Sequence, residues 1–103
     1  MLKPGTVVED IYNETMKQFD SRFAAGFMNG GKFLGHSIGL TMDESPAIAN
    51  RFKEVLTEGM TFALEPKIAL PGIGMVGSEN TYLVTANGGK ALTGSPHKLY
   101  CIY

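Results

Sequence analysis

The sequence predicts an α+β domain in which one long N-terminal helix packs on a mainly antiparallel sheet. Apolar residues recur at helical spacing near the start of the chain, and later segments alternate between apolar and polar residues. Asn-Gly-Gly at residues 87–89 is typical of a hairpin turn. A helix that precedes hairpin-linked strands favours an antiparallel sheet with the helix on one face.

The helix is expected over residues 6–24. Thr6 and Glu9 have the spacing of a capping box, in which each side chain bonds the backbone amide of the other residue. The apolar stripe that would face the sheet consists of Val8, Ile11, Met16, Phe19 and Phe23. Residues 26–31 contain Asn-Gly-Gly, which ends the helical pattern and starts a turn.

The rest of the chain is expected to supply the sheet. A glycine-punctuated irregular strand, two alternating strands and a short return strand are predicted at residues 32–40, 60–70, 75–85 and 90–93. Residues 46–56 are ambiguous and fit either a helical turn or a loop. Pro66 removes a ladder hydrogen bond, so its strand is expected to lie at an edge or to kink there.

Composition restricts the class of protein. The length of 103 residues suits one domain over residues 1–103, and nine Lys and Arg against ten Asp and Glu argue against nucleic-acid binding. The single cysteine excludes an internal disulfide, and no apolar run approaches the roughly 20 residues of a membrane span. We therefore expect a soluble, cytoplasmic protein that binds neither nucleic acid nor membrane.

Three side chains are candidates for chemistry. Glu65 is a carboxylate in an apolar strand, which is costly to bury unless it is paired or bound to a cation. Glu79 lies on a second strand, and His36 lies between glycines that let a ligand come close. One imidazole and two carboxylates suit zinc, manganese, iron or cobalt. Ordinary explanations stay open, because both Glu side chains can face water and His36 can be a hydrogen-bonded structural histidine.

Two side chains near the end of the sequence are expected to have no part in this chemistry. His97 is expected at the surface, and Cys101 is expected to be a small buried hydrophobe. The sequence contains no Walker loop, no dinucleotide glycine fingerprint, no His-Glu-x-x-His motif and no recognisable serine or cysteine triad.

Three segments around the candidates resemble motifs of the pita-bread metallopeptidases, the superfamily of methionine aminopeptidase, prolidase and creatinase. Residues 35–46 resemble G-H-G-[IV]-G-L-x-x-H-E-x-P, residues 59–66 resemble G-M-x-F-x-[IL]-E-P, and residues 76–85 resemble V-R-x-E-D-T-x-L-V-T. Residues 3–6 are similar to the K-P-G-V/T turn of the family. The spellings look closer to Xaa-Pro peptidase-like members, and the resemblance implies the C-terminal half of a pita-bread catalytic domain.

The resemblance also implies a site. In the intact protein, two divalent metal ions (manganese, cobalt, zinc or iron) would be held by two Asp, one His and two Glu. His36, Glu65 and Glu79 match the His, the first Glu and the Glu that bridges both metals. A bridging water would attack a peptide carbonyl, with His36 and Glu65 as catalytic residues and Glu65 as a proton shuttle. The implied substrate is a peptide, cleaved near its N-terminus by an Xaa-Pro dipeptidase or aminopeptidase.

The sequence departs from the family pattern in several positions. The two Asp ligands of the family precede the His, and Asp10 and Asp20 belong to the expected helix and its end, so neither replaces them. We therefore expect the missing N-terminal half to supply them, and this chain alone to bind metal weakly and to be inactive. Asp43 stands where the family usually has a second His that helps to hold the substrate. Gly77 stands where prolidase-like members often have Arg, and Asn80 stands where they have Asp. Asp43 is thus a substrate-binding candidate with altered chemistry.

Other functions remain open. A non-catalytic pita-bread binding module is compatible with the changes at Asp43 and Gly77, and a creatine-like amide could replace the peptide as substrate. A purely structural fragment would have Glu65 and Glu79 pointing apart, with His36 outside the cluster. Because half a domain leaves a sheet edge and an apolar face uncovered, we also expect a homo-oligomer.

Overall fold

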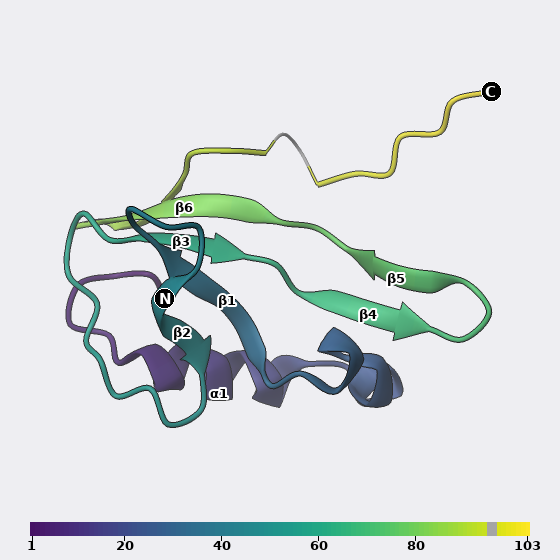
Figure 1. The fold of residues 1–103 in the computed structure, drawn as a ribbon, viewed down its shortest axis with the longest axis horizontal. Helices are drawn as coiled ribbons and strands as arrows, with labels where there is room; N and C mark the ends of the chain where they lie inside the picture. The colour runs from purple at the N-terminus through teal and green to yellow at the C-terminus, as the bar shows by residue number, and fades with distance from the viewer. Residues whose placement is uncertain (95–96) are drawn as a thin grey trace.

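The computed structural model describes residues 1–94 and 97–103. Over these residues the chain forms one α-helix, two 3-10 helices and seven strands (Figure 1). They are α1 (Val8–Gln18), η1 (Ser21–Gly26), η2 (Met28–Gly30), β1 (Phe33–Ile38), β2 (Glu44–Ala49), β3 (Thr61–Leu64), β4 (Lys67–Leu70), β5 (Gly74–Gly77), β6 (Asn80–Thr85) and β7 (Gly88–Ala91). The predicted α+β class is confirmed.

The strands form two antiparallel sheets. The larger sheet has the order β2-β1-β3-β6-β7, and β4 pairs with β5 in a two-stranded sheet. Two breaks separate these sheets, at residues 65–66 between β3 and β4 and at residues 78–79 between β5 and β6. Figure 1 shows the β4–β5 hairpin extending beyond the end of the larger sheet. Pro66 cannot donate to a ladder, which explains why the strand expected over residues 60–70 is divided.

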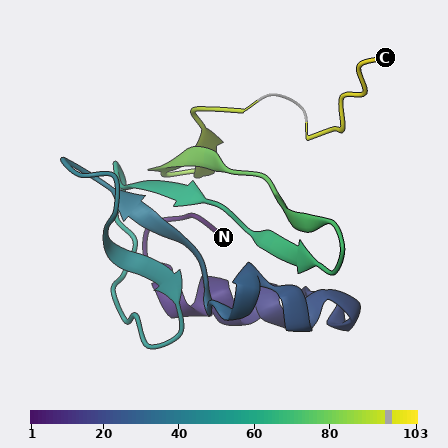
Figure 2. The same cartoon turned by 45° about the vertical axis from the view of Figure 1, so that its right-hand side comes forward.

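Helix α1 covers one face of the larger sheet (Figure 2). The core cluster consists of Leu2, Val8, Ile11, Phe27, Leu34, Ile48, Leu56, Phe62 and Val84. Phe62 of β3 and Val84 of β6 are fully buried there. Because side chains alternate along a strand, Ala63, next to Phe62, and its cross-strand partner Thr81, three residues before Val84, belong to the opposite face, away from the core cluster.

The helix is shorter than the one predicted over residues 6–24. It ends at Gln18, and the carboxylate of Asp20 then caps η1 by accepting from the backbone amide of Arg22 at 2.9 Å. Phe23, which the sequence placed on the apolar stripe, is partly exposed on η1 as a result. The local cap at Asp20 therefore stops a helical pattern that the apolar spacing alone would continue.

The predicted capping box does not form. Residue Val7 is the N-cap of α1, and its apolar side chain accepts no hydrogen bond. The carboxylate of Glu9 instead pairs with the ammonium of Lys53 and accepts from the backbone amide of Arg51 at 3.1 Å. Glu9 therefore ties α1 to the segment after β2 rather than to its own first turn.

The structure also bears on the remaining expectations from the sequence. The ambiguous segment at residues 46–56 begins inside strand β2, which lies at the edge of the larger sheet. His97 is exposed, as predicted, whereas the prediction that Cys101 is buried is wrong because this cysteine is exposed. Among the helices of residues 1–94 and 97–103, none combines the length and apolar character needed to cross a membrane.

Candidate functional site

The three predicted ligands come from separate strands of the larger sheet or from their ends. His36 lies on β1, Glu65 directly follows β3, and Glu79 directly precedes β6. His36 pairs with Ala63 of β3, and Ala63 pairs with Thr81 of β6, so the three positions share one face. Glu65 is two residues beyond Ala63 and Glu79 is two residues before Thr81. By the strand period of two, all three candidates belong to this face.

The strand register also brings the two Glu positions opposite each other. The same register holds on both sides of the breaks, with Leu64 paired to Asn80 and Lys67 paired to Gly77. Glu65 and Glu79 each lie one residue from the first of these pairs. They therefore occupy facing positions across the break, although neither is itself part of a strand.

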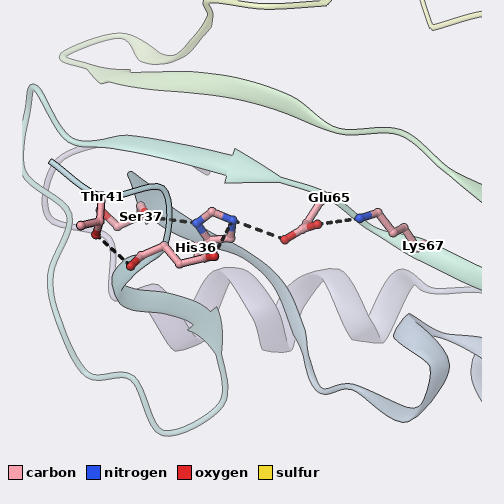
Figure 3. Close-up of polar contacts among 6 residues, drawn as sticks. His36, Ser37, Thr41, Glu65 and Lys67 are labelled. Carbon is pink, nitrogen blue, oxygen red and sulfur yellow. Dashed lines mark hydrogen bonds and ion pairs between the residues drawn. The ribbon is translucent and has the colours of Figure 1, made fainter. Parts of the chain in front are cut away.

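The imidazole of His36 contacts two carboxylates. Nε2 lies 3.4 Å from Oε1 of Glu65 (Figure 3) and 3.0 Å from Oδ1 of Asp43. The side chains of His36 and Glu65 are 13% and 16% exposed, whereas that of Asp43 is 75% exposed. His36 and Glu65 therefore form a largely buried pair that Asp43 joins from the solvent side.

A backbone contact determines which ring nitrogen of His36 faces this pair. Nδ1 lies 3.0 Å from the carbonyl oxygen of Ser37. Carbonyl and carboxylate oxygens only accept, so the Ser37 contact is satisfied by a hydrogen on Nδ1, and the contacts to Asp43 and Glu65 by a hydrogen or a cation on Nε2. Nε2 then faces the carboxylates of Asp43 and Glu65. This arrangement is favourable when a proton or a metal cation is bound at Nε2.

The second oxygen of Glu65 has a cationic partner. Oε2 accepts from Nζ of Lys67 at 2.7 Å (Figure 3), and the Lys67 side chain is 37% exposed. The hydrogen bond to Glu65 raises the pKa of Lys67 above its usual value, and the nearby charge of Glu79 adds a smaller contribution in the same direction. Lys67 is not among the candidate residues expected from the sequence. Its available signal was a lysine two residues after Glu65, on the same face of an otherwise apolar segment.

The loop between β1 and β2 holds Asp43 beside His36. The backbone amide and the hydroxyl of Thr41 both donate to Oε1 of Glu44, at 2.9 and 3.1 Å. A Cβ atom at Gly39 would lie 2.0 Å from Oε2 of Glu44, so a side chain there would have to displace this carboxylate from its contacts with Thr41. These contacts close the loop on itself and fix the segment that carries Asp43.

The donor types of this site fit a divalent transition metal, because imidazole nitrogen and carboxylate oxygen are its common ligands. His36 and Glu65 would supply two donors of such a site. Within residues 1–94 and 97–103, no three His, Cys, Asp or Glu side chains are arranged to hold an ion together. His36 and Glu65 touch, whereas Glu79 is exposed.

The fold and the sequence both occur in a known family of proteins. The profile of Metallopeptidase family M24 matches residues 1–86, so the chain belongs to this family of metallopeptidases. The family resemblance of the motifs around His36, Glu65 and Glu79 is therefore confirmed. The roles of the individual residues stay predictions.

Relatives with solved structures share the architecture. Xaa-Pro dipeptidase from Pyrococcus furiosus is 36% identical over 100 residues, which cover 94% of this chain and 27% of that protein. An X-Pro aminopeptidase from Thermotoga maritima superimposes with a TM-score of 0.80 at 28% identity, over 97% of this chain and 28% of that one. Prolidase from Pyrococcus furiosus superimposes with a TM-score of 0.76 at 35% identity, over 92% of this chain and 28% of that one. The pita-bread fold is thus confirmed, and this chain spans about a quarter of the length of these relatives.

Proposed function

We propose that this chain is part of a metal-dependent peptidase of the Xaa-Pro dipeptidase or aminopeptidase type, which hydrolyses peptide bonds near the N-terminus of its substrate. Membership in the metallopeptidase family and the names of the similar proteins support this proposal. The observation that carries it is the buried contact between Nε2 of His36 and the carboxylate of Glu65 at 3.4 Å. These two atoms are of the kinds that bind divalent transition metals.

The proposed metal ligands are His36, Glu65 and Glu79. Two divalent ions, of manganese, cobalt, zinc or iron, would bind in the intact protein, with two Asp ligands from the part of the relatives' length that this chain does not span. Bound metal would activate a water near neutral pH and polarise the substrate carbonyl. The Ser37 carbonyl orients His36, and Glu65 would take a proton from the attacking water and pass it to the leaving amine.

Asp43 is the proposed substrate-binding residue. Its carboxylate is exposed and lies 3.0 Å from Nε2 of His36, at the solvent side of the site. An ionised carboxylate accepts hydrogen bonds and donates none. Asp43 therefore suits a positively charged group, such as the free amino terminus of a peptide, better than a carbonyl oxygen.

A non-catalytic binding module is the second candidate function. It is favoured because two of the proposed metal ligands already have partners within the protein: Asp43 contacts His36, and Lys67 contacts Glu65. Hydrolysis of a non-peptide amide would use the same residues as the leading proposal. The substrate panel below separates these alternatives.

The test uses the protein expressed from its complete reading frame and loaded in turn with Mn²⁺, Co²⁺ and Zn²⁺. Its substrates are Xaa-Pro dipeptides, Ala-Ala, a longer peptide and creatine. We expect hydrolysis of the peptides, and a fall in kcat of at least ~100-fold in Glu65→Gln, because a positioned proton carrier contributes about 10²–10⁴-fold. The exposed Glu58→Gln is the matched control and should keep its activity. Peptide binding without turnover would favour the binding module, and turnover of creatine alone would favour the non-peptide amide.

The proposal extends to the chain taken by itself. We expect no peptidase turnover from residues 1–103 alone, because their described part forms an incomplete group of ligands. We also expect self-association in the cytoplasm, since apolar side chains are exposed on the β4–β5 hairpin and its turn, at Ile73, Met75 and Val76. Turnover by the purified chain, or a clean monomer in gel filtration at high concentration, would contradict these two expectations.

A further inference from the structure

A lysine ammonium lies at the candidate metal site. Nζ of Lys67 is 2.7 Å from Oε2 of Glu65, and the negative charge of Glu79 acts on the same ammonium (Figure 3 shows the Glu65 contact). Glu65 and Glu79 occupy facing positions across the strand break. Lys67 is therefore a cation beside two carboxylates that would both bind metal.

Local structure holds Lys67 in this position. Its backbone amide donates to Sδ of Met28 at 3.2 Å, and its partner across the β4–β5 pair is Gly77. A Cβ atom at Gly77 would lie 2.4 Å from Cγ of Lys67 and 2.7 Å from the carbonyl oxygen of Pro66. The lysine side chain thus occupies the space that a side chain at residue 77 would need.

We propose that Lys67 is a positioning residue, an internal cation that holds the Glu65 carboxylate in the metal-free protein and competes with a divalent metal ion for it. This inference rests on the proposed function, because it takes Glu65 as a metal ligand. The Glu65 side chain is 16% exposed, and both Glu65 and Asp43 contact Nε2 of His36. An unpaired negative charge on Glu65 would therefore be costly. A metal ion that binds the Glu65 carboxylate must therefore displace the ammonium of Lys67 or share the carboxylate with it.

The test measures Mn²⁺ binding by calorimetry in the protein expressed from its complete reading frame. Lys67→Met removes the competing charge, Lys67→Arg keeps it, and Lys32→Met is a matched charge change at an exposed lysine just before β1. Because partly exposed ion pairs are individually weak, we expect Lys67→Met to tighten Mn²⁺ binding by roughly three- to tenfold. Lys67→Arg and Lys32→Met should stay within about twofold of the parent protein on the same reasoning.

One further variant and one further measurement make the test independent of a single substitution. Gly77→Ala keeps the charge but crowds the Lys67 side chain, and we expect it to tighten Mn²⁺ binding as well. The ¹³C chemical shift of the Glu65 carboxyl in metal-free protein should move in Lys67→Met and stay unchanged in Lys32→Met. Circular dichroism of each variant without metal confirms that the fold is retained.

His36→Ala separates failure of the inference from failure of the proposed function. We expect His36→Ala to weaken Mn²⁺ binding in both the parent and the Lys67→Met background. If it weakens binding while Lys67→Met leaves binding unchanged or weaker, the role of Lys67 is overturned and the site stands. If His36→Ala has no effect on Mn²⁺ binding in either background, the metal site itself is wrong, and the inference falls with it.

Discussion

Nδ1 of His36 lies 3.0 Å from the carbonyl oxygen of Ser37, the next residue along β1. This contact turns Nε2 toward Glu65 at 3.4 Å. A histidine that donates through one nitrogen to a backbone carbonyl presents its other nitrogen as a ligand in many metal sites. The local backbone of β1 therefore suits the proposed role of His36 as a metal ligand.

The tautomer of His36 is the first testable consequence. We expect the ring to carry its hydrogen on Nδ1 when a metal ion occupies Nε2, because the Ser37 carbonyl can only accept. Long-range ¹H–¹⁵N correlation spectra of protein saturated with Zn²⁺ measure this directly. The exposed His97 provides an internal reference in the same spectrum. A His36 ring with its hydrogen on Nε2 would contradict the assignment.

The close approach of β1 to β3 gives a second prediction. A Cβ atom at Gly35 would lie 1.9 Å from the carbonyl oxygen of Ala63, so Gly35→Ala must push the two strands apart. We expect a loss of about 1–3 kcal/mol in the free energy of unfolding, as for other overpacked sites. The same shift separates His36 from Glu65, which should weaken Mn²⁺ binding.

Urea denaturation measures this loss, and Gly30→Ala is the matched control. Gly30 has open space around its missing Cβ but a φ of +89°, so its substitution tests backbone strain without a clash. Gly35→Ala with the stability and Mn²⁺ affinity of the parent protein would show that the strands are farther apart than described here.

The pairing of Glu9 gives a prediction on pH. The hydrogen bond from Lys53 lowers the pKa of Glu9 below its usual value, and the backbone amide of Arg51 adds to this effect against the opposing cost of desolvation. The resulting stabilisation is complete above the unfolded-state pKa of about 4.3 and is lost as the pH falls through the lower folded-state pKa. Glu9→Gln should therefore reduce stability at neutral pH and flatten the acid limb of the stability curve.

Thermal unfolding between about pH 3 and pH 7 tests this linkage over the range in which Glu titrates. The exposed Glu58→Gln removes an equal charge away from Lys53 and serves as control. Equal acid sensitivity in Glu9→Gln and the parent protein would show that the Glu9–Lys53 pair does not contribute to stability.

Local patterns in the sequence predicted where several candidate residues lie in the fold. The period of two assigned Glu65 to the face of Ala63, and Pro66 predicted the interruption that follows it, because both effects depend on adjacent residues. Glu9 was misassigned because its partner Lys53 lies 44 residues away. Lys67 was missed although its partner Glu65 is only two residues away, because a lysine on a strand most often faces water and Pro66 was expected to interrupt the strand between them.

The central claim is that His36 and Glu65 bind a shared cation, with Glu79 on the same face. Paramagnetic broadening of backbone amide signals by substoichiometric Mn²⁺ tests it most directly, since the method detects weak binding by this chain as it stands. We predict that the signals of His36, Glu65 and Glu79 broaden first, and that His36→Ala abolishes this selectivity. Broadening centred on Glu9, Glu14 or Asp20, or equal broadening at all exposed carboxylates, would contradict the claim.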